Sequence, residues 1–151
     1  MLISKNRKAL FDHELLEKFT AGIILKGYEV KAIKENKATF DGSYVQLIEG
    51  EPFVVNMYVG KYSKQSRDFD ELSARRNRKI LLNKSEIDKL AREISQKGKT
   101  AVPLALILDK GNIKLEFAIV KGRKEFEKKQ VAKERQIKKD LENETKELRS
   151  W

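Results

Sequence analysis

The chain has 151 residues and contains neither an internal repeat nor a linker rich in proline, glycine or serine, so its length fits one domain of ordinary size with an extension. Its 33 lysines and arginines outnumber its 23 aspartates and glutamates, and the resulting net charge of +10 indicates a polyanionic partner. Because cysteine is absent, thiol catalysis, disulfides and cysteine-ligated metals are excluded.

Signals for an enzyme or a membrane protein are also missing. His13 is the only histidine, so no second imidazole could share a metal with it. Neither a Walker loop nor a GxGxxG motif occurs, and we expect no catalytic residue, no metal, no cofactor and no small-molecule substrate. No apolar run approaches the roughly 18 residues of a membrane-spanning helix, and the first residues do not resemble a secretory signal. We therefore expect a cytoplasmic protein that does not bind membranes.

The first elements in chain order are a strand, a helix and a hairpin. Residues 17–27 (EKFTAGIILKG) are rich in apolar and β-branched side chains and end at glycine, which predicts a strand buried on both faces. Residues 27–37 (GYEVKAIKENK) predict a shorter helix after it. Residues 43–59 (SYVQLIEGEPFVVNMYV) follow the pattern of a hairpin, with Pro52 near a strand start, where its missing N–H matters least.

The second half contains the clearest local signals. Residues 83–98 (NKSEIDKLAREISQKG) predict a helix with Asn83 as N-cap and Glu86 as its capping-box partner. Its apolar stripe, which includes Leu90 and Ala91, would cover one opening of a β-structure. The segments TAVPLALIL and IKLEFAIV, joined by the turn at residues 109–112, predict a second hairpin. In its second strand the alternation places Ile113, Leu115, Phe117 and Ile119 inward, and Lys114, Glu116 and Ala118 outward.

Several short antiparallel strands with helices at the rim fit a small barrel, because closure removes unpaired sheet edges. The predicted fold class is mainly β with helices, an OB-fold-like antiparallel β-barrel over residues 1–122 with peripheral helices. Residues 123–151 are predicted to form a separate basic tail. Such barrels often bind nucleic acid, but a fold alone does not establish a function.

The C-terminal segment, residues 125–151, has the composition of a helix but has little to bury. A helix there would align Val131, Leu141 and Leu148 in a stripe too thin to dock firmly on a core. Residues 121–151 carry 11 basic and 7 acidic side chains. The segment is therefore either a solvated tail without a role or a segment that folds against something outside this chain.

Three basic clusters are candidate phosphate sites. Residues 75–79 (RRNRK) directly precede apolar Ile-Leu-Leu, so a charged loop runs into a buried segment and could hold phosphates rigidly. The alternative is a solvated loop. Residues 5–8 (KNRK) and 121–124 (KGRK) are the other clusters. Candidate aromatic residues for base stacking are few, which favours a folded RNA recognised by shape and backbone. The candidates are Tyr28, Tyr58, Tyr62 and Phe69, and we expect the three tyrosines to be packed rather than stacked on bases.

In this order, the motifs resemble those of the SsrA-binding protein family, known as small protein B. The matching segments are AGIILKGYEVKAI, GSYV, RNRKILLNKSEI, VPLAL, IKLEFAIVKGRK and KERQ, and the resemblance extends from Asn6 to about Arg135. Its most specific parts are GYEVK at residues 27–31 and RNRKILLN at residues 76–83.

The resemblance implies a protein that is not an enzyme. Its OB-like barrel would bind the tRNA-like domain of transfer-messenger RNA (tmRNA, also called SsrA) and deliver it to stalled ribosomes for trans-translation, that is, ribosome rescue and peptide tagging. The tail would enter the empty mRNA channel beside ribosomal RNA of the decoding region and fold there as a helix. The RNA-binding residues it implies, together with the basic clusters, are Asn6, Lys8, Glu29, Lys31, Arg76, Arg78, Lys79, Leu81, Asn83, Lys121 and Lys124. The ribosome-binding tail residues are Lys128, Lys129, Lys133, Arg135, Lys138 and Lys139.

Three of these residues have alternative interpretations. Leu81 can equally belong to the core, and Asn83 is also the predicted N-cap, so their loss could weaken RNA binding through the fold. Glu29 cannot attract phosphate, and we expect it to accept a hydrogen bond from a base, a ribose hydroxyl or a neighbouring lysine.

The chain departs from the family pattern at several positions. Phe11 stands where histidine is common, and Thr20 where glutamate is common. Phe126 and Lys129 stand where the family often has a histidine or tyrosine and an arginine. A bidentate arginine contact would be lost at Lys129, because lysine behaves as a point charge. Trp151, the only tryptophan, has no expected role.

Two other functions fit the same composition. One is a general RNA-binding or ribosome-associated barrel without a role in rescue. The other is a protein-interaction adaptor or membrane-surface binder that uses the basic helix, although the tail has no bulky apolar anchors before Trp151 for a membrane.

Overall fold

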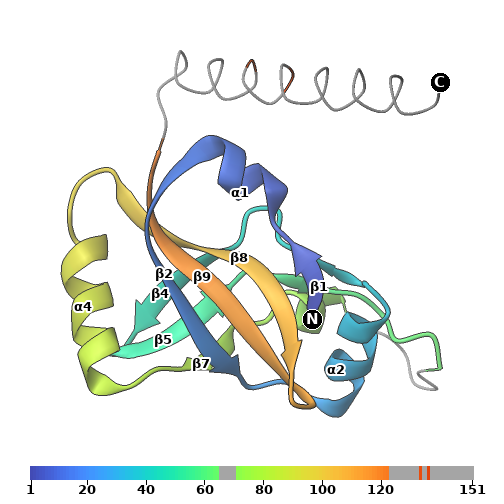
Figure 1. The fold of residues 1–151 in the computed structure, drawn as a ribbon. Helices are drawn as coiled ribbons and strands as arrows, with labels where there is room; N and C mark the ends of the chain where they lie inside the picture. The colour runs from blue at the N-terminus through green and yellow to red at the C-terminus, as the bar shows by residue number, and fades with distance from the viewer. Residues whose placement is uncertain (65–70, 123–132, 134–135, 137–151) are drawn as a thin grey trace.

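The chain folds into a closed antiparallel β-barrel with helices packed around it (Figure 1). The computed structural model describes residues 1–64 and 71–122, together with Lys133 and Gln136. The strands are β1 (Leu2–Lys5), β2 (His13–Ile23), β3 (Ala38–Thr39), β4 (Tyr44–Ile48), β5 (Glu51–Val55), β6 (Tyr58–Val59), β7 (Arg78–Leu81), β8 (Lys99–Asp109) and β9 (Asn112–Gly122). The helices are α1 (Arg7–Asp12), α2 (Gly27–Lys34), α3 (Glu71–Ala74) and α4 (Lys84–Ile94).

Strand pairing closes the barrel. In ring order, β8 pairs with β4, then β5, β7, β2 and β9 follow, and β9 pairs back with β8, all antiparallel. Strand β1 adds to β8 as a seventh strand, and β3 and β6 form a separate small sheet. This architecture confirms the predicted mainly β, OB-like barrel with peripheral helices, whereas the predicted helical tail lies outside the described residues except at Lys133 and Gln136.

Both predicted hairpins are confirmed, and each closes through a two-residue turn. Glu49 and Gly50 join β4 to β5 with φ of 52° and 80°, and Lys110 and Gly111 join β8 to β9 with φ of 50° and 81°. Positive φ at both central residues is the type I′ geometry, whose twist matches that of the flanking strands. Pro52 lies near the start of β5, as predicted.

The core lies inside the barrel, where Phe19 of β2 stacks on Phe117 of β9 with ring centroids 5.1 Å apart. Ile33 of α2 and Leu90 of α4 enter this core from two helices. A second apolar cluster lies beneath α1 on the other face of β8 and β9. It contains Ala118, which lies on the outward face of β9 as predicted and is buried there because α1 covers that face.

The prediction for the first strand is only partly correct. Strand β2 spans His13–Ile23 rather than residues 17–27, and only Phe19 and Ala21 are fully buried along it. The expectation of burial on both faces is wrong, because the outward side chains of β2 carry no covering layer along most of its length. Residues 24–27 connect it to α2, and the Ile24 N–H donates to the Lys79 carbonyl at 2.9 Å.

The two predicted helices are confirmed. Asn83 caps α4 through its Oδ1, which accepts from the Glu86 N–H at 2.9 Å, while Glu86 Oε1 accepts from the Asn83 N–H at 3.1 Å. Leu90 covers the barrel core, but Ala91 is exposed, so the buried stripe is narrower than predicted. In the described part of the chain, no helix is long and apolar enough to cross a membrane.

Candidate nucleic-acid interface

The predicted RNA-binding residues lie on two separate surfaces of the barrel. Strands β2 and β9 run antiparallel along the barrel wall, with His13 paired to Gly122 at one end and Gly22 paired to Lys114 near the other. A strand of this length spans roughly 30 Å at about 3.3 Å per residue. The turn-end surface comprises Lys31, Arg76, Lys79, Leu81 and Asn83, with Glu29 and Arg78 buried beneath it, and the α1 surface comprises Asn6, Lys8 and Lys121.

A buried ion-pair network underlies the turn-end surface. Arg78 and Glu29 are 0% and 2% exposed. Arg78 Nε donates to Glu29 Oε2 at 2.7 Å, and its Nη atoms donate to the carbonyls of Met57 and Ala74 at 2.5 and 2.9 Å. A salt bridge of 2.6 Å from Nη2 to Glu29 Oε2 completes the fork. The guanidinium therefore ties α2 and the start of β7 to α3 and to Met57, the residue before β6.

This burial bears on the predicted roles of two residues, Arg78 and Glu29. The N–H groups of Arg78 donate to protein oxygens, and its side chain is closed to solvent. It therefore cannot bind a phosphate at the surface. Glu29 accepts from Arg76, Arg78 and the Lys26 N–H, so a neighbouring lysine is one of its donors, as expected, and two arginine side chains are the others. The sequence contained a usable signal, because a strand at residues 78–81 places Arg78 on the same face as Ile80.

The network sets the protonation of Glu29. Burial by itself would raise the pKa of this carboxyl, but the hydrogen bonds from Arg76 and the Lys26 backbone, with the charge of Arg78, lower the pKa below its ordinary value of 4.5. A lowered folded-state pKa means that the unfolded chain binds protons more readily. The stability that Glu29 contributes is therefore complete above the unfolded pKa and is lost as pH falls through the folded pKa.

We expect this linkage to appear in a Glu29→Gln variant. At neutral pH the variant should unfold more easily than the parent protein, because Arg78 loses its counter-charge while remaining buried. The difference in unfolding free energy should shrink as pH falls below about 4.5, because the unfolded parent chain then takes up a proton at this carboxyl that the folded protein does not bind until a lower pH. Urea unfolding at pH 7, 5.5 and 3.5 measures it, and a difference that stays constant with pH would contradict the assignment. Glu35 and Glu93, whose pKa values are also lowered, are present in both proteins and cancel.

The turn-end surface also carries accessible cations, one from the network and two outside it. The Arg76 side chain is 27% exposed although it pairs with Glu29. Lys79 lies on the outer face of β7 and makes an exposed ion pair of 3.3 Å with Glu51, which contributes little to stability and is easily exchanged for a phosphate. Lys31 is exposed on α2, with its Nζ 5.3 Å from the ring centroid of Tyr62.

The tyrosines proposed for stacking each have a cation nearby. Lys26 lies 5.9 Å from the centroid of Tyr28, and the guanidinium of Arg75 lies 5.1 Å from that of Tyr58. Tyr58 and Tyr62 are half-buried and Tyr28 is at the margin of exposure, whereas Phe69 lies outside the described residues. These contacts leave Tyr28 as the most accessible of the described three.

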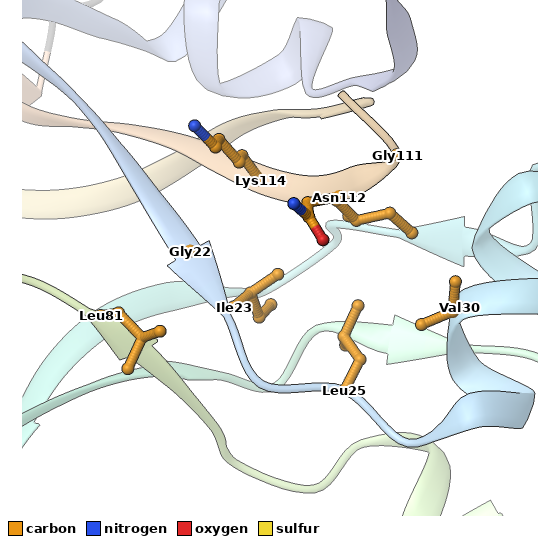
Figure 2. A pocket seen from close by; sticks show the side chains of 9 residues that line it. Gly22, Ile23, Leu25, Val30, Leu81, Gly111, Asn112 and Lys114 are labelled. Atoms are coloured by element: carbon orange, nitrogen blue, oxygen red, sulfur yellow. The ribbon is translucent and has the colours of Figure 1, made fainter. Parts of the chain in front are cut away.

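Leu81 belongs to the surface and not to the core. It is 54% exposed at the end of β7, beside Gly22 of β2, so the core interpretation of this residue is wrong. A Cβ placed on Gly22 would lie 3.2 Å from Leu81 Cδ1. The two residues form one edge of a pocket of about 360 Å³ whose other walls come from β2, α2 and the β8–β9 turn (Figure 2). An exposed apolar side chain among lysines suits a ligand that has both charged and apolar parts.

Asn6 and Asn83 differ in which side-chain hydrogen-bonding groups remain available to a ligand. Asn6 caps α1 by accepting from the Ala9 N–H at 3.2 Å, and its amide also donates to the Pro103 carbonyl at 2.8 Å. Asn83 uses its Oδ1 for the α4 cap, and no acceptor among the described residues takes a bond from its amide nitrogen. The oxygen and the nitrogen of the Asn6 side chain are therefore both engaged within the fold. Asn83, in contrast, can cap the helix and present N–H donors at the same time.

The α1 surface lies where β9 ends and the chain continues into residues 123–151. Lys8 and Lys121 are exposed there, and Asn6, Lys8 and His13 help to line a second pocket of about 210 Å³.

Phe11 is half-buried on α1, and Thr20 is exposed on β2. Lys133 is exposed. The remaining predicted residues of this region, Lys124, Lys128, Lys129, Arg135, Lys138 and Lys139, lie outside the described residues, as do Phe126 and Trp151.

Within the described residues, no group of three or more histidine, aspartate or glutamate side chains could hold a metal ion. The features present are a rigid barrel, an exposed leucine beside a pocket, and basic side chains on two separated surfaces. Together they define a polyanion-binding protein of the OB-like class.

The comparisons with known proteins identify the family. The model of the SmpB protein family matches residues 3–147, so the chain belongs to the SmpB family. SsrA-binding proteins of Streptomyces coelicolor and Acholeplasma laidlawii are 39% and 41% identical to it over 141 and 139 residues, which cover 93% and 92% of this chain and 87% and 92% of theirs. The predicted resemblance is thereby confirmed.

A solved structure agrees with the sequence comparisons. A chain from work described as "tmRNA-SmpB: a journey to the center of the bacterial ribosome" matches with a TM-score of 0.69 and 37% identity, over 83% of this chain and 87% of that one.

Proposed function

We propose that this protein binds transfer-messenger RNA and delivers it to stalled ribosomes for trans-translation. Membership of the SmpB family and the likeness to a chain from a tmRNA-SmpB ribosome study support this function over that of a general RNA-binding barrel. The protein acts as an RNA-binding factor, without a catalytic step of its own, in the cytoplasm where ribosomes work.

The structural observation that carries the proposal is the separation of the two basic surfaces. A protein that binds RNA non-specifically needs only one basic surface. A protein that delivers one RNA to another must contact the two RNAs at the same time. We assign the turn-end surface to the tRNA-like domain of tmRNA, through Lys31, Arg76, Lys79, Leu81 and Asn83. The α1 surface lies at the start of residues 123–151, and we assign it, together with that tail, to ribosomal RNA.

The domain division follows the same logic. Residues 1–122 contain the whole barrel and both surfaces, while residues 123–151 form the tail that enters the mRNA channel. A tail with so little apolar surface gains more from ribosomal phosphates than from its own barrel. Its acidic residues can pair with lysines and arginines one turn away, which supports a helix without removing the positive charge.

Competition binding tests the main claim. Purified protein at physiological salt should prefer tmRNA to an unrelated folded RNA of equal length by a hundredfold or more, which corresponds to about 2.7 kcal/mol. The affinity should also fall with salt, with a logarithmic slope of roughly 0.7 to 0.9 for each phosphate contact. Equal binding of the two RNAs would leave only the general RNA-binding alternative.

Substitution of Asn83 separates its two roles. Asn83→Ala should lower the unfolding free energy by about 1 kcal/mol through loss of the α4 cap, whereas Asn83→Ser keeps a capping oxygen and should cost only a few tenths. Both variants remove the amide donors, so both should bind tmRNA more weakly. Calorimetric melting and RNA titration measure the two effects. Full affinity in Asn83→Ser would assign this residue to the fold alone.

A further inference from the structure

The pocket beside Leu81 has mostly apolar walls. Its walls include the apolar side chains of Ile23, Leu25, Val30 and Leu81, and Gly22 leaves space at its edge where any larger residue would press on Leu81. Its volume of about 360 Å³ falls in the range of small-molecule sites, which runs from about 300 to 1,000 Å³. The pocket is therefore wide enough for a ring and lacks the depth of a buried core cavity.

One neutral polar group lies among these walls. Figure 2 shows the amide of Asn112 directed toward the Ile23 side of the opening, whereas the chain of Lys114 extends the other way. Lys114 Nζ pairs with Asp109 Oδ2 at 3.1 Å, so it is held at the rim. An asparagine amide offers one donor and one acceptor side by side, which matches the hydrogen-bonding edge of a nucleobase.

The charge around the pocket favours a phosphate-bearing ligand. Lys79 and Leu81 are two residues apart on the outward face of β7, a separation of roughly 7 Å along the strand. The Lys26 side chain is exposed at the start of α2, next to the pocket residue Leu25 in the chain. A nucleotide whose base enters the pocket would thus keep its phosphate near lysine side chains.

We infer that this pocket receives one unstacked nucleobase of the bound RNA, held between Leu81 and the apolar wall of β2 and α2, with Asn112 at the edge of the base. This inference rests on the proposed function and deepens it, because it separates a base contact from the phosphate contacts on the same surface. Unpaired bases that leave the stack are the parts of a folded RNA that proteins can read individually. Leu81 is the wall of this site, and Lys79 is a phosphate partner outside it.

Paired variants of the full-length protein test the inference. Leu81→Ala should weaken tmRNA binding by roughly five- to a hundredfold and leave the slope of affinity against salt unchanged, because no ion pair is removed. Leu81→Met should restore most of the affinity. Lys79→Ala, its matched control on the same strand face, should lower the slope by about 0.7 to 0.9.

Chemical probing of the same complexes locates the base. Dimethyl sulfate and a carbodiimide together report the exposed edges of all four bases. Parent protein and Lys79→Ala should protect the same unpaired base of tmRNA, and Leu81→Ala should leave that base reactive. If Leu81→Ala instead lowers the salt slope as Lys79→Ala does, or leaves every protection intact, the pocket holds no base. The parent protein's preference for tmRNA over unrelated RNA is a separate readout, so the proposed function can stand while this inference fails.

Discussion

Replacement of Arg78 by alanine is expected to lower the unfolding free energy by about 3 to 5 kcal/mol, which is a large part of the stability of a domain of this size. The reason is the burial of both partners. Without the guanidinium, Glu29 keeps its negative charge in a site closed to solvent, and the carbonyls of Met57 and Ala74 lose their donors. Urea unfolding followed by circular dichroism measures the loss.

Lys79→Ala provides the matched control. Lys79 is the next residue in β7 and also forms an ion pair, but that pair is exposed, so its removal should cost less than about 1 kcal/mol. A combined Glu29→Met and Arg78→Met variant should recover much of the stability lost in Arg78→Ala, because two apolar side chains leave no unpaired buried charge. An Arg78→Ala protein as stable as Lys79→Ala would show that the network does not hold α2 on the barrel.

Truncation after Gly122 is expected to end peptide tagging on stalled ribosomes while leaving tmRNA affinity within a few-fold of that of the full chain. All barrel strands and both described surfaces lie before this point, so the RNA-binding body is complete without the tail. The missing residues carry the basic side chains that we assign to the mRNA channel. The measurement pairs a binding titration with a reconstituted tagging assay on ribosomes that hold a message without a stop codon.

Thermal unfolding controls for the truncation, since the shortened protein should melt at the temperature of the full chain. With the truncated protein, the tagging signal should be no higher than in a control reaction from which this protein is omitted. A truncated protein that still supports tagging would defeat the assignment of residues 123–151 to the ribosome, and one that loses tmRNA affinity severely would show that the tail also contacts the tRNA-like domain.

Elements with complete local signals were predictable from the sequence. Helix α4 follows from its capping box, and the β8–β9 hairpin follows from alternation around a glycine-containing turn. The start of β2 was missed because Glu14, Leu15 and Leu16 do not alternate, and the strand is irregular there, with a shift in register between Leu15 and Glu17. Pairing with β9, about a hundred residues later, decides where β2 begins.

The sequence predicts which residues belong to the candidate site, but not which of them are buried and which are exposed. A run of basic residues indicates phosphate contacts, and only the fold shows that Arg78 turns inward to Glu29, 49 residues away in the chain, while Lys79 turns outward. The position of Leu81 beside Gly22 likewise comes from the pairing of β7 with β2, and nothing covers its side chain there, since it is 54% exposed. Local patterns do not contain such distant partners, although the alternation within β7 does predict which of its residues share a face.

The pairing of β2 with β9 also has a consequence for how the protein is made. These strands are neighbours in the barrel but lie at opposite ends of the folded chain, so closure requires contacts of high sequence separation, and such topologies fold slowly. During synthesis, β2 leaves the ribosome long before its partner exists. A nascent chain that stops before β9 has no closed barrel, and Gly22 and Lys114 are not yet paired beside the Leu81 pocket. Only a protein translated through its last strand acquires the RNA-binding surface, so an incomplete product of a broken message would not compete for the RNA.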